Sequence, residues 1–176
     1  MITAPHAPSH VDIRPARPAD AAAVGRFVQS LSERSKRFRF HGAISGDSPA
    51  LQKLLCDVDG VHHQAWLAWA DAGRGEIVVG EARFVLSADD EAELAIAVAD
   101  DWQGRGLADR MLRQLLGAAT TAGVARLYGD VMDSNCRMRA FMRRNCFESR
   151  RLVSSELVRM SRTLPRSMPL RRPACA

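Results

Sequence analysis

The stretch DWQGRGLA, residues 101–108, places two glycines around an arginine, after an apolar run and before a helical pattern. A glycine-rich turn between a strand and a helix can bind phosphate, because N–H groups in the first helical turn lack internal partners and the helix dipole favours an anion. The N–H donors would come from Gly104, Arg105, Gly106, Leu107 and Ala108. The side chains of Gln103 and Arg105 offer further contacts.

Two common phosphate motifs do not fit this turn. The nucleoside-triphosphate motif needs Lys and then Ser or Thr after its second glycine, whereas Leu107 and Ala108 follow Gly106. The dinucleotide motif G-x-G-x-x-G would place its third glycine at Asp109, whose charge is unfavourable beside a pyrophosphate. The pattern that remains is Gln103-x-x-Gly106-x-Ala108, preceded by the strand pattern EAELAIAV.

This pattern resembles the acetyl-CoA motif of the GNAT (Gcn5-related) N-acetyltransferases, and the resemblance covers about residues 13–160. The chain is most similar to the GNAT domain of bacterial Pat-type protein-lysine acetyltransferases. The similarity is carried by LSERSKRFRF (31–40), VGEARFVL (79–86), AELAIAV (92–98) and DSNCRMRAFMRRNCF (133–147). In the last segment, Asn135 and Met138 form an N-x-x-M pattern.

The resemblance implies an enzyme of class EC 2.3.1 that transfers an acetyl group from acetyl-CoA to a primary amine without a covalent intermediate. Residues 103–108 would hold the pyrophosphate, and Asn135 would contact the pantetheine arm. The backbone that would pair with that arm belongs to Ile96, Ala97 and Val98. Opening the sheet to admit the arm usually needs a β-bulge, which we expect here, and the small residues Ala95 and Ala97 suit the close approach of the arm.

The resemblance to Pat-type domains makes a protein lysine the expected acceptor. A small-molecule amine is one alternative. A non-catalytic acyl-CoA-binding or sensing module, in which the glycine-rich turn is functional but the catalytic base is not, is another. No further domain of the kind attached to some Pat-type proteins is recognised in the sequence.

Glu93 is the candidate general base. It lies in a strand otherwise built from apolar residues, where a carboxylate is costly to bury, and burial would raise its pKa toward the working pH. It also matches the glutamate that serves as base in Pat-like domains. The alternative is structural: Glu93 lies on a solvated strand face or pairs with an arginine such as Arg83.

The chain departs from the wider family at the residue that protonates the leaving thiolate. Many GNAT enzymes have a tyrosine there, but the matching residue is Met142, and the single tyrosine is Tyr128. Cys146 replaces the usual glycine before Phe147. A basic run holds Arg34, Arg37 and Arg39 in the segment where the family builds part of the acceptor site; contact with an acidic acceptor or CoA and a solvated helix face are both open.

The elements that must position these residues follow from periodicity. Leu107 to Ala119 forms an apolar helical stripe, and Gly123 is placed to end that helix. Asp20 and Ser48 are candidate helix caps, and Ser134-Asn135 begins a helix. Strands are expected at 11–14, 65–70, 76–86, 91–99, 124–132 and 153–160. The order predicts an α/β (mixed α+β) fold: a mixed, mostly antiparallel twisted sheet of six or seven strands with helices on both faces.

The length of 176 residues and 47% hydrophobic content predict a single domain over residues 11–162. Residues 1–10 and 163–176, rich in proline, are expected to be flexible tails. The sequence has neither a membrane-length apolar run nor a signal-peptide pattern, so we expect a cytoplasmic protein without membrane contact.

The remaining composition excludes other classes of site. The spacing of Cys56, Cys136, Cys146 and Cys175 fits neither a metal site nor a disulfide framework, so reduced, mostly buried thiols are expected and no metal is predicted. The net charge of +5 could attract nucleic acid, but few aromatic residues and only two lysines argue against that partner. The expected assembly is a monomer or a homodimer.

Overall fold

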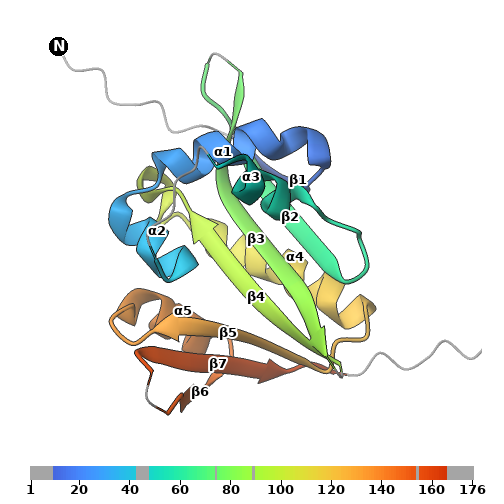
Figure 1. Ribbon diagram of the computed structural model, residues 1–176, viewed down its shortest axis with the longest axis vertical. Helices are drawn as coiled ribbons and strands as arrows, with labels where there is room; N and C mark the ends of the chain where they lie inside the picture. The colour runs from blue at the N-terminus through green and yellow to red at the C-terminus, as the bar shows by residue number, and fades with distance from the viewer. Residues whose placement is uncertain (1–9, 43–47, 74, 89, 154, 166–176) are drawn as a thin grey trace, which may run out of the picture.

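The computed structural model describes the chain except residues 1–9, 43–47, 74, 89, 154 and 166–176, so most of both expected tails lies outside the described residues. One seven-stranded sheet runs in the order β1-β2-β3-β4-β5-β7-β6 (Figure 1). Neighbouring strands are antiparallel except for the parallel pair β4 and β5. The mixed, mostly antiparallel sheet is therefore confirmed.

The described strands and helices follow the expected order. The strands are β1 (Val11–Pro15), β2 (His63–Asp71), β3 (Glu76–Ala88), β4 (Glu91–Val98), β5 (Arg126–Met132), β6 (Glu148–Arg151) and β7 (Leu157–Thr163). The α-helices are α1 (Ala21–Ser30), α2 (Glu33–Phe40), α3 (Pro49–Cys56), α4 (Leu107–Thr121) and α5 (Cys136–Arg144), with 3₁₀ turns η1 (Pro18–Asp20) and η2 (Asp100–Trp102).

Two details differ from the sequence prediction at the C-terminal end. The short edge strand β6 was not predicted, because its sequence ESRR is exposed at all four positions and has no apolar alternation. The last strand, predicted at 153–160, begins at Leu157 and runs to Thr163. Leu164 is buried, so the packed structure extends slightly beyond the predicted limit at residue 162.

Short polar residues begin several helices. The Ser32 and Ser48 hydroxyls accept hydrogen bonds from the backbone N–H groups of Ser35 and Leu51, as N-caps do. Asp20 precedes α1, but its carboxylate accepts from the backbone N–H of Arg17 and so does not cap α1 as expected. Gly123 follows α4 with φ 79°, the left-handed conformation that commonly ends a helix.

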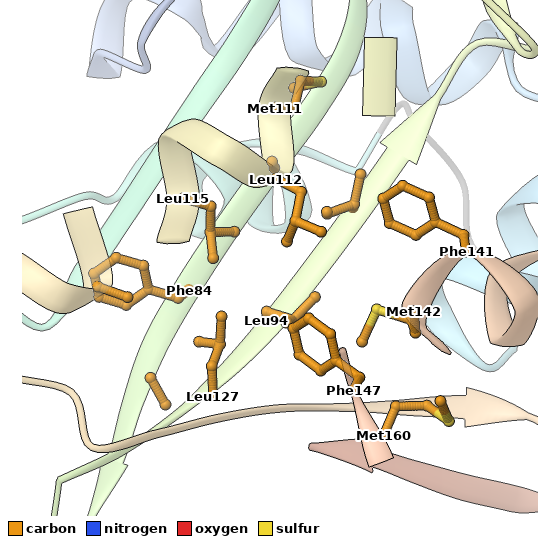
Figure 2. Packing of buried hydrophobic residues seen from close by; sticks show 14 of the residues in the cluster. Phe84, Leu94, Met111, Leu112, Leu115, Leu127, Phe141, Met142, Phe147 and Met160 are labelled. Carbon is orange, nitrogen blue, oxygen red and sulfur yellow. The ribbon is translucent and has the colours of Figure 1, made fainter. Parts of the chain in front are cut away.

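Helices cover both faces of the sheet, as predicted. A core cluster on one face joins the sheet to α4 and α5, and Figure 2 shows Met111, Leu112 and Leu115 of α4 packed toward Phe84 and Leu94. A second cluster joins the other face to α1 and α3. None of the helices in the described part of the chain has the length and hydropathy that crossing a membrane requires.

Candidate active site

The two parallel strands β4 and β5 form a fork. They pair at Glu91 with Arg126, Ala92 with Leu127 and Glu93 with Tyr128, and no pairs follow. Beyond Glu93 the strands diverge, and Figure 1 shows the opening widening toward α2 and α5. The sheet therefore has a gap between its two central strands that closes at Glu93 and opens toward the C-terminal end of β4.

The β4 edge of this fork turns backbone hydrogen-bonding groups toward the opening, and one of them, the Val98 carbonyl, accepts from a side chain. In an antiparallel pair, successive residues point their N–H and C=O groups to alternate sides. Because the Ala99 N–H donates to the Val79 carbonyl at 2.9 Å, Ala97 faces β3, whereas Ile96 and Val98 face the fork. Two of the three residues predicted to pair with a pantetheine arm thus present backbone groups to the opening.

The expected β-bulge at Ala95 and Ala97 is wrong. β4 keeps a continuous register with β3 from Val98 to Ala92, and the irregularity in that pair lies between Leu86 and Ala88. The opening arises instead because β5 turns away from β4. At the point of divergence, a Cβ on Gly129 would lie 3.1 Å from the Leu94 carbonyl oxygen, so only glycine permits this approach without a shift.

The glycine-rich turn lies directly beyond the end of β4, at the mouth of the fork. Gly104 and Gly106 have φ of 77° and 74° on either side of Arg105, a backbone arrangement that turns successive N–H groups toward a common concavity. Among the described residues, the N–H groups of residues 104–108 donate no hydrogen bond, and a Cβ on Gly106 would meet nothing within 4 Å. The predicted phosphate cradle thus has free donors and open space.

Gln103 lies between the cradle and the strand. Its Nε2 donates to the Val98 carbonyl at 3.0 Å, and its Oε1 accepts from Arg137 Nη1 at 2.7 Å. Arg105, by contrast, lies with its guanidinium 5.1 Å from the Trp102 ring centroid. Arg137 was not among the predicted site residues, although it stands two residues after Asn135.

Asn135 is held at the start of α5, on the β5 side of the fork. Its Oδ1 accepts from the Met138 backbone N–H at 3.1 Å, and the residue is 8% exposed. The donor is a backbone N–H, so this cap fixes Asn135 without depending on the side chain at position 138. Its predicted contact with the cofactor arm stays a prediction.

Glu93 is exposed rather than buried, so the argument from the cost of burial was wrong for this residue. Its neighbours Ala92 and Leu94 enter the core, and the alternation of β4 turns Glu93 to the opposite face. Arg83 is bonded to Glu81, His63 and the Leu55 carbonyl, so it is not the partner of Glu93.

The buried carboxylate of this face is Glu81, which is 1% exposed. It accepts hydrogen bonds from Arg39 of α2 and from Arg83 of the same strand. Burial alone would raise the pKa of Glu81, but the two guanidinium groups outweigh it and lower the pKa below its ordinary value. Glu81 is therefore an ionised anchor that fixes α2 on the sheet.

Tyr128 lies beside Glu93, with its ring under a guanidinium. Arg159 is 4.1 Å from the ring centroid and is held by two hydrogen bonds to Asp130, at 2.8 and 2.7 Å. The pKa of Arg159 is raised, mainly by the hydrogen bond to Asp130 and in smaller part by charges that include Glu93. The closed end of the fork therefore carries both charge signs on its exposed face.

The other predicted residues separate into different environments. Arg34 and Arg37 are exposed on α2, whereas Arg39 is taken up by Glu81. Met142 is buried in the core, so this helix offers no proton donor at that position. The described cysteines are free thiols, but only Cys56 is buried; the expectation of mostly buried thiols was wrong for Cys136 and Cys146.

Asp100 connects the cradle to α2. Its carboxylate accepts from the Ser32 backbone N–H at 3.0 Å and from the hydroxyls of Ser32 and Ser35 at 2.9 and 2.8 Å. Partial burial acts to raise the pKa of Asp100, but these hydrogen bonds outweigh it and lower the pKa. The turn η2 before the cradle is thus tied to the N-terminus of α2.

A fork between parallel strands, with a glycine-rich turn of free N–H groups at its mouth, matches what the resemblance to acyl-CoA-dependent transferases implies. Residues 30–146 match the acetyltransferase (GNAT) family, so the chain belongs to that family. The protein is accordingly an N-acetyltransferase, a transferase of class EC 2.3.1.

Two relatives support this assignment. The chain is 34% identical over 131 residues to acetyltransferase PA5475 of Pseudomonas aeruginosa, covering 74% of this chain and 70% of that protein. It is 31% identical over 134 residues to acetyltransferase Pat of Mycolicibacterium smegmatis, covering 75% of this chain. The match spans only 39% of Pat, so the whole activity of Pat does not transfer to this chain.

Solved structures show the same fold. The GNAT domain of S. lividans PAT superposes with a TM-score of 0.80 at 24% identity, covering 88% of this chain and 90% of that one. Among other structures with this fold, at 17% and 14% identity, one holds acetyl-CoA and another coenzyme A. These likenesses show the fold.

Proposed function

We propose that this acetyltransferase acts on a protein lysine, with Glu93 as the general base at the closed end of the β4–β5 fork. The observation that carries the proposal is the position of Glu93: it is exposed at the last residue pair before the strands separate. In Figure 1 the near sides of β5 and β7 carry no helix, which leaves room for a segment of another protein.

The residues present fit acetyl-CoA. The outward backbone groups of Ile96 and the N–H of Val98 can pair with the amides of the pantetheine arm, as an added strand would, whereas the Val98 carbonyl already accepts from Gln103. The free N–H groups of residues 104–108 can hold the pyrophosphate. Asn135 keeps its Nδ2 group out of the cap hydrogen bond and can donate to the arm. The thioester supplies an activated acetyl group when acetyl-CoA is bound.

A base is needed because a lysine amine is protonated at neutral pH. With a pKa of about 10.4, roughly one amine in 10³ is neutral at pH ~7.4, an obstacle of about 4 kcal/mol. Glu93 would accept the proton from the ammonium group, directly or through a water molecule. General bases typically contribute about 10²–10⁴ in rate.

The proposed step balances without a further reactant. Glu93 passes the proton taken from the ammonium group to solvent and is ionised again. The neutral amine nitrogen then forms a bond to the acetyl carbon, the carbon–sulfur bond breaks, CoA leaves as the thiolate, and the second proton lost by the nitrogen passes to the Glu93 carboxylate. The thiolate leaves with a pKa near that of a cysteine thiol, about 8.5, so it needs little assistance at neutral pH. This fits the burial of Met142 at the position where many relatives carry a proton donor.

Similarity to the Pat GNAT domain supports a protein acceptor. The exposed Arg34 and Arg37 on α2 offer positive charge for an acidic surface around the target lysine. A small amine is the alternative acceptor, and a module that binds acyl-CoA without turnover is the alternative to catalysis.

The deciding experiment measures CoA release over a panel of lysine-bearing proteins and a matched panel of small amines. We expect CoA release with one or more of the proteins. Mass spectrometry of those proteins should then locate the added acetyl group on lysine side chains. Turnover with small amines alone would overturn the protein-lysine assignment. Binding of acetyl-CoA without CoA release from any acceptor would favour the sensing module.

A further inference from the structure

One chain of hydrogen bonds joins the two arms of the fork at its mouth. The Val98 carbonyl of β4 accepts from Gln103 Nε2 at 3.0 Å, and Gln103 Oε1 accepts from Arg137 Nη1 at 2.7 Å. Arg137 belongs to α5, which follows β5. We call these three residues the mouth clasp; it spans the place where a bound pantetheine arm would leave the fork.

The guanidinium of Arg137 is poised beside the cradle. Its Nη2 lies 3.7 Å from the position that a Cβ on Gly104 would take. Two of the other three arginines of α5 lie beside carboxylates: Arg139 pairs with Asp133, and Arg144 lies 3.9 Å from Asp109, whereas Arg143 is exposed. No carboxylate in the described part of the chain pairs with Arg137, so its charge is left for an anion.

The chemistry of the clasp suits a phosphate ligand. A guanidinium presents several N–H donors in a planar array and binds phosphate oxygens with two of them at once. The amide oxygen of Gln103 orients this array through one N–H without neutralising its charge. Gln103 is in turn fixed by β4, so the orientation of Arg137 is set before any ligand arrives.

We propose that Arg137 binds the pyrophosphate of coenzyme A across the cradle, and that Gln103 acts mainly as a positioning residue for it. This inference rests on the proposed CoA site. We favour the pyrophosphate over the 3′-phosphate as the group that Arg137 binds. Arg137 lies against Gly104, and Gly104 belongs to the turn whose N–H groups are free.

The test is calorimetric binding of CoA and of dephospho-CoA, which lacks only the 3′-phosphate, to the full chain. Arg137→Ala is expected to weaken both ligands by about 10- to 100-fold, as loss of a charged hydrogen-bonding partner does. Arg143→Ala is the matched control, since Arg143 is exposed on the same helix. It removes the same charge and should change either affinity by about fivefold at most.

Two further variants separate charge from geometry. Arg137→Lys keeps the charge without the planar array and should fall between the wild type and Arg137→Ala. Gln103→Ala should weaken both ligands less than Arg137→Ala does, and combining the two should add little to Arg137→Ala alone. Thermal unfolding of each variant checks that the exposed substitutions leave the fold intact.

The outcomes are distinct. Equal affinities for Arg137→Ala and Arg143→Ala, with wild type binding CoA, would overturn this inference and leave the proposed function standing. A loss seen with CoA but absent with dephospho-CoA would assign Arg137 to the 3′-phosphate and overturn the pyrophosphate assignment. A wild-type chain that binds neither ligand would overturn the proposed function and the inference together.

Discussion

Glu93 on β4 and Tyr128 on β5 are partners in the last parallel pair before the two strands separate. Parallel partners point to the same face of the sheet, so both side chains flank the closed end of the fork on the face away from α4. This relationship places a carboxylate at the closed end of the fork, the position that the proposed function requires of its general base.

The first prediction concerns this carboxylate. Glu93→Gln should lower turnover by about 10²–10⁴-fold, because the amide keeps the shape but accepts no proton at neutral pH. The dissociation constant of acetyl-CoA, measured by calorimetry, should stay within about threefold, since the cradle and the β4 edge are untouched.

Glu91→Gln is the matched control for that variant. Glu91 lies two residues earlier on the same strand, and its partner is Arg126 at 3.5 Å. It should keep turnover near that of the wild type. Equal loss in both variants would indicate a general effect of charge on this face, and no loss in Glu93→Gln would remove Glu93 as the base.

The second prediction concerns the cradle. Gly106→Asp should abolish measurable acetyl-CoA binding, because it adds a negative charge and a side chain where the free N–H groups converge. The glycine also has φ 74°, so part of any effect could come from backbone strain.

Gly60→Asp isolates that strain. Gly60 has φ 73° and open space around its Cβ position, but it lies before β2, at the other end of the sheet. Both variants should lose similar unfolding free energy in thermal melts, and only Gly106→Asp should lose ligand-induced stabilisation. Retained acetyl-CoA stabilisation in Gly106→Asp would mean that the phosphate lies elsewhere.

The third prediction concerns the buried Glu81. Glu81→Gln should lower the free energy of unfolding by about 3–5 kcal/mol, because it leaves the buried Arg83 and the partly buried Arg39 without their counter-charge. Glu76→Gln is the comparison on the same strand: it breaks the exposed pair with Arg14 and should cost about 0–1 kcal/mol. Chemical denaturation of both variants measures the difference.

Glu81 and Glu93 show how far the sequence could lead. Both are glutamates within apolar strands, and the cost of burying a charge applies to either pattern. Which one is buried depends on whether helices cover that part of the face, and this is set by tertiary packing. Arg39 of α2 reaches Glu81, 42 residues away, a contact that no local pattern encodes.

The cradle was predictable for the opposite reason. Its donors are backbone groups of consecutive residues, so glycine spacing and the following helix determine its geometry locally. The sheet was predicted to open at β4, which is correct, but the predicted cause was a β-bulge, which is wrong. The opening depends instead on how β5 diverges from β4 near Gly129. The hydrogen bond between Gln103 and Arg137 likewise joins residues 34 apart in the sequence, so no local sequence pattern predicts it.

The fourth prediction concerns Cys146, which follows α5 with φ 62°. A residue with a Cβ is strained in this left-handed conformation by about 1–2 kcal/mol, whereas glycine adopts it freely. Cys146→Gly should therefore raise the free energy of unfolding by about 1 kcal/mol, after allowance for the greater flexibility of glycine in the unfolded chain.

Cys146→Ala is the control for that substitution, because it removes the thiol but keeps the Cβ. It should leave stability within about 0.5 kcal/mol of the wild type. If Cys146→Ala stabilises as much as Cys146→Gly, removal of the exposed thiol explains the gain and backbone strain does not.

The fifth prediction concerns pH and His63. Arg83 Nη1 lies 2.8 Å from His63 Nε2, and the Asp57 carbonyl lies 2.7 Å from Nδ1. A guanidinium only donates, so Nε2 must accept and Nδ1 must carry the proton, which makes the folded imidazole neutral. Burial, with a smaller effect of Arg83, lowers the pKa of His63 below 6.5, although Glu81, Asp57 and Asp59 act in the opposite direction.

The sign of the pH effect follows from this shift. Below pH 6.5 the unfolded chain takes up a proton at His63 that the folded chain resists, so the free energy of unfolding should fall as the pH drops from 6.5 toward the lowered folded pKa. The slope from this group is at most about 1.4 kcal/mol per pH unit. His63→Gln should flatten that segment in a series of urea denaturation curves measured at different pH values. If His63→Gln leaves the slope unchanged, another group must titrate in this pH range, because the substitution removes the proton-binding difference at position 63.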